Sequence, residues 1–161
     1  MSRVRLIHWN DVEAKKRERQ LFEAGYDVVH QLPRTNLLHE LRADPPSAVV
    51  IDLSRLPSQG RDCALAIRQT KALRHVPLVF VTDNCEKAAA IKKLLPDATF
   101  ASWKKIRSSL KHAIANPPVE PVVPPSRMAG YSGTPLPKKL GIEEGSVVAT
   151  IAAPPARRET S

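Results

Sequence analysis

The chain is poor in cysteine and in aromatic residues. Of its 161 residues, two are cysteines, and Trp, Tyr and Phe together make up 4%. Two cysteines, Cys63 and Cys85, are too few for a disulfide framework or a metal-ligating cluster. We therefore expect both thiols to be reduced, as in a cytosolic protein, and no disulfide. Because aromatic rings are scarce, the hydrophobic core should be built from Val, Ile, Leu and Ala.

The sequence also lacks a long hydrophobic run. No apolar stretch approaches the ~20 residues that a helix needs to span a bilayer. Near the N-terminus, Arg3, Arg5 and Asp11 interrupt any apolar segment that could act as a signal peptide. These absences predict a soluble cytoplasmic protein that is not bound to a membrane.

Charge is out of balance, with 25 Lys and Arg against 16 Asp and Glu, a net charge of +9. Residues 1–116 hold 20 cations and 12 acids, so +8 of the excess lies there. The cations gather at Lys15, Lys16, Arg17 and Arg19, and again at Lys104, Lys105, Arg107 and Lys111. A basic surface can attract nucleic acid or an acidic protein. No aromatic residue lies among the first four cations, so a platform for base stacking is missing there.

Five short apolar segments rich in β-branched residues predict strands. The segments are Val4–Ile7, Val28–Val29, Ala48–Ile51, Leu78–Val81 and Thr99–Ala101. The third and fourth are continuous instead of alternating, which is typical of central strands in a parallel sheet that is covered on both faces.

Helix-like stretches separate these strands. They run from Asn10 to Gly25, over Leu37–Arg42, from a cap at Asp62 to about Lys71, from a cap at Asn84 to Leu95, and from Lys104 to Ala115. Five strand–helix pairs predict an α/β fold with a five-stranded parallel sheet, order 2-1-3-4-5, and helices on both faces.

The composition changes after Asn116. Nine of the 15 prolines follow it. We expect a first domain over residues 1–116, a stiff Pro-rich linker over 117–127, and a partial second domain or mostly extended tail over 128–161.

Polar residues stand where three of the predicted strands end. Asp52 follows the third strand and Thr82 the fourth, while His8, Trp9, Asn10 and Asp11 follow the first. In a parallel α/β sheet, functional sites form at this carboxyl edge. An acid in such a place can also simply cap the next loop by accepting backbone N–H bonds. Both interpretations of Asp52 remain open at this stage.

The block SAVVIDLSRLPSQG (residues 47–60) and the later VPLVFVTD (76–83) resemble the receiver domain of bacterial two-component response regulators. Gly25-Tyr26 before the second strand and His75-Val76-Pro77 before the fourth add to this resemblance, which covers roughly residues 3–116. It implies a flavodoxin-like receiver fold. It also implies that Asp52 takes a phosphoryl group from a histidine kinase, and that the Thr82 hydroxyl contacts that group.

The resemblance implies two further parts that this sequence lacks or has moved. An acidic pair after the first strand should help Asp52 to hold Mg²⁺, but that place is taken by His8 and Trp9, or, with a shift, by Asn10 and Asp11. The candidate metal ligands are therefore Asp11 and Asp52 alone. A lysine at the end of the fifth strand should supply a cation, and its position falls on Ser102 or Trp103.

We accordingly predict a degenerate, non-enzymatic receiver-like module that acts by binding another protein, without an output domain and without a cofactor. The first alternative is a working phosphoacceptor receiver that uses Asp52 and Mg²⁺, with a histidine kinase as partner. The second alternative is a basic regulator that binds nucleic acid, which the charge permits and no motif supports.

The tail carries a separate resemblance. Residues Met128 to Pro154 are similar to the opening stretch of a small uncharacterised bacterial domain family. This resemblance implies a gene fusion or a truncated second domain, and no particular chemistry.

Overall fold

The computed structural model describes residues 2–30 and 36–124. These belong to the first of two units into which the chain divides, Met1–Gly130 and Tyr131–Ser161. The predictions for residues 125–161, including the tail over 128–161 and its family resemblance, lie outside the described residues. Within the described part, no helix is both long and apolar enough to cross a membrane.

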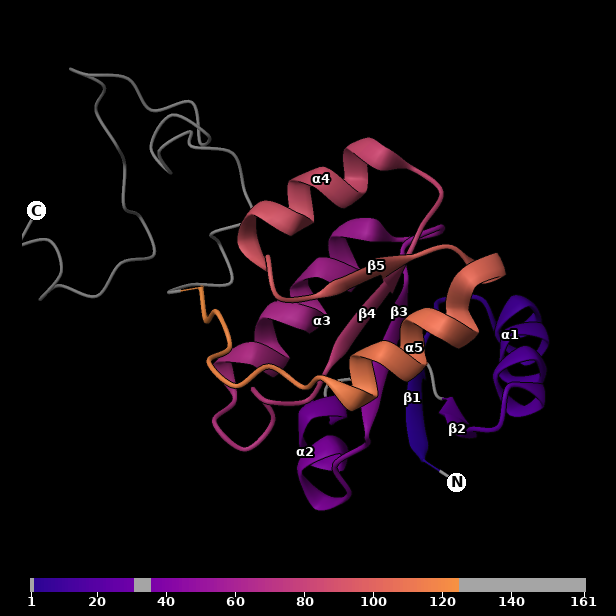
Figure 1. Cartoon of the computed structure of the whole chain (residues 1–161), viewed down its shortest axis with the longest axis horizontal. Helices are drawn as coiled ribbons and strands as arrows, with labels where there is room; N and C mark the ends of the chain where they lie inside the picture. Colours follow the sequence, from indigo (N-terminus) through magenta and orange to yellow (C-terminus); the bar gives the residue numbers. More distant parts are fainter. Residues whose placement is uncertain (1, 31–35, 125–161) are drawn as a thin grey trace, which may run out of the picture. The chain divides into compact units, whose positions relative to one another are not determined.

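The sheet has the predicted architecture (Figure 1). Its strands are β1 (Arg3–Ile7), β2 (Asp27–His30), β3 (Ala48–Asp52), β4 (Leu78–Val81) and β5 (Thr99–Ala101). They pair in the order β2-β1-β3-β4-β5, and every pairing is parallel. The predicted five-stranded parallel sheet of order 2-1-3-4-5 is thereby confirmed. All carboxyl ends of the strands point to the same edge.

Helices cover both faces of the sheet. They are α1 (Asp11–Glu23), α2 (Leu37–Ala43), α3 (Pro57–Gln69), α4 (Cys85–Leu94), the short 3-10 turn η1 (Trp103–Lys105) and α5 (Ile106–Ala115). Alternate residues of β1 and β3 face opposite sides, since Ile7 and Ile51 pack with α2, α3 and α4, while Leu6 and Val50 pack with α1 and α5. Strands that are buried on both faces explain the continuous apolar runs of the sequence.

The predicted helix starts hold for two helices and fail for one. Asn10 Oδ1 accepts from the Glu13 N–H at 3.0 Å, and Asn84 Oδ1 accepts from the Lys87 N–H at 3.0 Å. The predicted cap at Asp62 is wrong, because α3 begins five residues earlier at Pro57. Proline suits the first turn of a helix, where its missing N–H costs no hydrogen bond.

Gly60 lets α3 lie close against β3. A Cβ atom at this position would come within 2.7 Å of Leu53 Cδ2 and 3.0 Å of Ile51 Cγ2. Both neighbours are fully buried. The glycine is therefore a packing requirement of the segment that follows Asp52, and it helps to fix the loop between β3 and α3.

The start of the predicted linker lies against the domain. His75 Nδ1 donates to the carbonyl of Pro118 at 2.9 Å, Asp97 Oδ2 accepts from the Val122 N–H at 2.9 Å, and Gln69 Nε2 donates to the carbonyl of Pro124 at 3.2 Å. Residues 117–124 thus contact the end of α3, the loop before β4 and the loop before β5. The predicted domain limit after residue 116 stays a prediction.

Candidate functional site

The carboxylate of Asp52 lies at the carboxyl edge of the sheet and is only 3% exposed. Its Oδ1 accepts a hydrogen bond from the backbone N–H of Ser54 at 2.8 Å, which is the loop-capping contact considered from the sequence. Its Oδ2 accepts from the indole Nε1–H of Trp103 at 2.8 Å. The same oxygen lies 3.4 Å from Nε2 of His8. Both carboxylate oxygens therefore already face N–H groups.

His8 lies directly after β1 and is 1% exposed. Its Nδ1 accepts from the backbone N–H of Asn10 at 3.1 Å, so this nitrogen carries no proton and Nε2 does. Nε2 faces Asp52 Oδ2 and lies 3.6 Å from Glu13 Oε2. Burial lowers the pKa of His8 below its usual 6.5 and outweighs the two carboxylates, which act to raise it. The imidazole next to Asp52 is thus a neutral N–H donor at pH 7.

Trp103 closes the site from the other side. It lies in η1, directly after β5, and α1 holds it in place through two side chains. The guanidinium of Arg17 lies over the indole ring, 4.6 Å from its centroid, and Gln20 Nε2 donates to the Trp103 carbonyl at 2.7 Å. A cation over an indole face is attracted to its quadrupole. Trp103 occupies one of the two positions where the receiver resemblance implies a lysine.

An ion pair joins the loop after Asp52 to α1. Arg55 Nε donates to Glu13 Oε2 at 3.2 Å, and Arg55 Nη2 makes a second contact with Glu13 Oε1. The hydrogen bond from Arg55 lowers the pKa of Glu13. This pair is not predictable from the sequence, because the partners are 42 residues apart and no local pattern links them.

The other two predicted site residues, Thr82 and Asp11, lie at the same edge of the sheet. Thr82 follows β4, is partly exposed, and its Oγ1 accepts from the Asn84 N–H at 3.0 Å, ahead of α4. Asp11 is exposed in the first turn of α1. The phosphoryl-contact role of Thr82 and the metal role of Asp11 and Asp52 stay predictions.

The groups around Asp52 do not fit a divalent cation. Mg²⁺ needs oxygen lone pairs in near-octahedral geometry, whereas here N–H groups point their positive ends at the carboxylate. Among the described residues, no group of three or more His, Cys, Asp or Glu could hold a metal ion. To admit a cation, His8 and Trp103 would have to give up their contacts with Oδ2.

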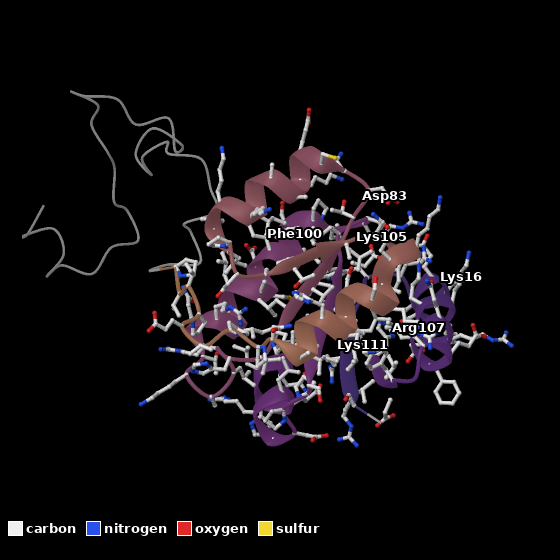
Figure 2. All side chains as sticks on the ribbon, viewed as in Figure 1. Lys16, Asp83, Phe100, Lys105, Arg107 and Lys111 are labelled. Atoms are coloured by element: carbon white, nitrogen blue, oxygen red, sulfur yellow. The ribbon has the colours of Figure 1, made fainter. Side chains whose placement is uncertain are left out.

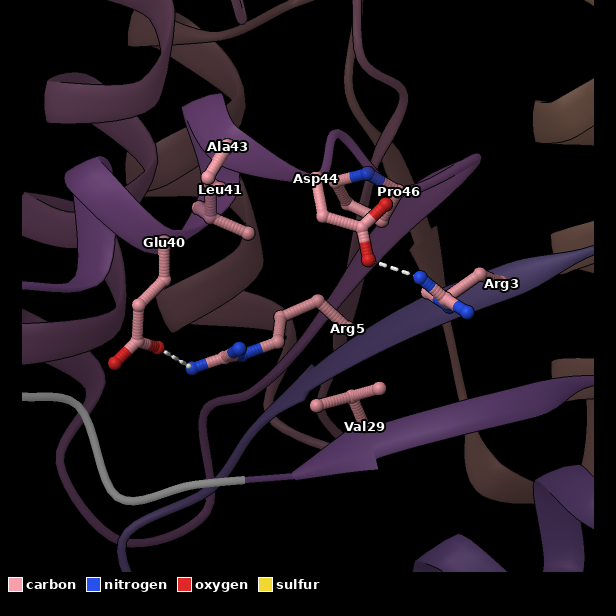
Figure 3. A pocket seen from close by; sticks show the side chains of 8 residues that line it. All are labelled: Arg3, Arg5, Val29, Glu40, Leu41, Ala43, Asp44 and Pro46. Atoms are coloured by element: carbon pink, nitrogen blue, oxygen red, sulfur yellow. Dashed lines mark hydrogen bonds and ion pairs between the residues drawn. The ribbon is translucent and has the colours of Figure 1, made fainter.

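A cavity of about 390 Å³ lies apart from Asp52, between α2 and the strands β1 and β2 (Figure 3). It is lined by Arg3, Arg5, Val29, Glu40, Leu41, Ala43, Asp44 and Pro46. Arg5 Nη2 pairs with Glu40 Oε2 at 2.9 Å, and Arg3 pairs with Asp44 (Figure 3). The two cations and two acids balance, so this cavity holds internal ion pairs and is separate from the Asp52 cluster.

Comparison with protein-family models and with curated proteins finds no match to this chain. Solved structures of similar fold include a putative response regulator from Chloroflexus aurantiacus, with a TM-score of 0.62 and 16% identity over 71% of this chain and 98% of that one. A sensor protein from Polaromonas sp. JS666 has a TM-score of 0.62 and 20% identity over 71% and 97%.

A third similar structure contains a metal ion. It is the receiver domain of the sensor histidine kinase PA1611 from Pseudomonas aeruginosa, with magnesium coordinated in its active-site cleft. Its TM-score is 0.56, with 17% identity over 71% of this chain and 98% of that one. At such identities the likeness establishes the receiver fold and leaves the chemistry to the residues of this chain.

Proposed function

We propose that this chain is a receiver-like signal-transduction module that works by binding a protein partner and does not accept a phosphoryl group. The receiver fold supports the first part of the proposal. The observation that carries the second part is the hydrogen bond from the Trp103 indole to Asp52 Oδ2. Under this proposal, residues 1–116 form the module, 117–127 a Pro-rich linker, and 128–161 a partial second domain or mostly extended tail.

Phosphoryl transfer to a carboxylate makes two physical demands. One oxygen must be free to approach phosphorus, and nearby positive charge must offset the charge that arrives with the phosphoryl group. At Asp52, Oδ1 is engaged by Ser54 and Oδ2 by Trp103. His8 is neutral, since burial lowers its pKa, and Arg55 is already paired with Glu13. The hydrogen bonds to both oxygens and the neutral imidazole therefore act against phosphoryl transfer to Asp52.

The experiment that tests the proposal is incubation of the full chain with acetyl phosphate and Mg²⁺, followed by intact-mass measurement. We expect no phosphoryl adduct on the wild-type chain, and none on Asp52→Asn treated in parallel. An adduct on the wild type that is absent from Asp52→Asn would contradict the proposal and favour the alternative, a working phosphoacceptor receiver. An adduct on both proteins would place the modification elsewhere and leave Asp52 unreactive, as proposed.

A further inference from the structure

The exposed face of η1 and α5 carries charge of one sign. Its exposed cations are Lys104, Lys105, Arg107 and Lys111. The sequence has no acidic residue between Asp97 and Glu120. We call these four side chains the η1–α5 basic face. They account for +4 of the +8 carried by residues 1–116.

Helix α1, by contrast, is electrically balanced. Its four cations, Lys15, Lys16, Arg17 and Arg19, are matched by Asp11, Glu13, Glu18 and Glu23. One of these pairs, Arg19 with Glu23, lies at 3.5 Å. Of the two basic clusters found in the sequence, only the second therefore produces a surface with net charge.

The four cations follow one another along two consecutive elements, Lys104 and Lys105 in η1 and Arg107 and Lys111 in α5. Figure 2 labels Lys105 in η1, and Arg107 and Lys111 on α5. Lys104, Arg107 and Lys111 are three and four residues apart, the spacing of one helix face. At 1.5 Å per residue, they span about 10 Å. Phosphates of duplex DNA supply one negative charge per ~1.7 Å of helix axis, so several phosphates lie within this span.

The side chains of the η1–α5 basic face favour a phosphate backbone over an acidic protein as the partner. A protein interface has apolar or aromatic anchors at its centre, where charged residues are depleted. The exposed large apolar residues of the described part are Val12, Phe22, Leu56, Val119, Val122 and Val123, and none lies on η1 or α5. Exposed Ser108 stands among the cations instead. Lysine, arginine and hydroxyl side chains are the groups that contact a phosphate backbone.

A shallow groove of about 190 Å³ borders the face on the side of α1. Its lining includes Gln20, Trp103, Lys104 and Arg107, with Glu23 as the single acid among the lining residues. Arg17 lies over one face of the Trp103 ring, 4.6 Å from its centroid, and so occupies a surface on which a base could otherwise stack. Contacts with phosphates, independent of base sequence, are what this surface can provide.

We propose that the η1–α5 basic face binds the phosphate backbone of nucleic acid without sequence preference. This activity goes beyond the signalling role proposed above and does not depend on the state of Asp52. Four phosphate contacts give a salt dependence with a slope near −0.9 per contact. The affinity should therefore fall roughly 100-fold between about 50 and 200 mM salt.

The test is fluorescence anisotropy of the full chain with a labelled DNA duplex of scrambled sequence, about 20 base pairs long, at several salt concentrations. The test variant changes Lys104, Lys105, Arg107 and Lys111 to Gln. A matched control changes Lys15, Arg19, Lys92 and Lys93 to Gln, which removes the same formal charge from α1 and α4. Thermal melts verify that both variants are folded.

We expect the test variant to lose at least about tenfold in affinity at low salt and to show a flatter salt slope, while the control stays within about threefold of wild type. Equal losses in both variants would overturn the proposal, because net charge alone would then explain binding. Absence of binding by wild type at 50 mM salt would overturn it as well. So would displacement of the DNA by polyglutamate at equal charge concentration, which would indicate an acidic protein as the partner.

Discussion

Replacing Asp52 by leucine is expected to destabilise the folded chain by about 3 kcal/mol, because it leaves three N–H donors, two of them part-buried and one on the buried His8, without their acceptor. The Ser54 N–H and the Trp103 indole N–H each lose a bond of 2.8 Å, and His8 Nε2 loses the carboxylate it faces. Each unsatisfied buried donor costs roughly 1–3 kcal/mol. Asparagine keeps one side-chain oxygen, so Asp52→Asn should cost only about 1–2 kcal/mol.

Urea denaturation of the three proteins measures these differences. Asp83, the exposed aspartate two residues after β4, provides the matched control, since Asp83→Leu should change stability by less than about 0.5 kcal/mol. The sign of the Asp52 effect matters most. When an aspartate lies among other carboxylates, replacing it by a neutral residue stabilises the folded protein, because repulsion between like charges is removed. Asp52 variants as stable as wild type, or more stable, would therefore contradict the donor-lined site.

The second large effect concerns metal binding. The double variant His8→Asp, Trp103→Lys should gain Mg²⁺ binding by at least about tenfold over wild type. His8→Asp removes the imidazole N–H that faces Asp52 Oδ2, and Trp103→Lys removes the indole N–H that bonds to it. The new carboxylate after β1 supplies a second oxygen ligand next to Asp52, and two carboxylates are a usual protein contribution to a Mg²⁺ site.

Thermal melting with and without Mg²⁺ detects this gain. A cation at ten times its Kd stabilises the folded state by about 1.4 kcal/mol. The control is Trp103→Lys alone, which loses the same indole packing but adds no ligand, and should respond to Mg²⁺ no more than wild type does. If Mg²⁺ does not raise the melting temperature of the double variant either, then His8 and Trp103 are not the groups that keep a cation from Asp52.

The sequence predicts the fold well because its signals are local. Continuous apolar strands, the caps at Asn10 and Asn84, and the stop at Gly25 each act within a few residues, and the structure has all of them. The start of α3 was missed since two local signals compete there. Asp62 resembles a cap, but Pro57 five residues earlier already fits the first helical turn.

The sequence predicts where the site lies but not the contacts that its side chains make. The strand pattern placed Asp52 at the functional edge, and the receiver resemblance pointed to His8 and Trp103 as departures. It did not reveal that Trp103 donates to Asp52, because the two residues are 51 positions apart and the bond depends on side-chain direction. The charge pattern was likewise ambiguous, since the cations of α1 attract notice in the sequence although four acids in the same helix balance them.

The proposed function depends most on the hydrogen bond from the Trp103 indole to the Asp52 carboxylate. The indole N–H resonance of Trp103 reports on this bond directly. The chain has two tryptophans, so two indole resonances are expected in a ¹H–¹⁵N spectrum, and Trp103→Phe identifies the relevant one. We expect slow exchange of this proton with solvent and an unchanged chemical shift as Mg²⁺ is added. A saturable shift of the Trp103 resonance with Mg²⁺, accompanied by faster exchange, would show that a cation opens the site and would contradict the account.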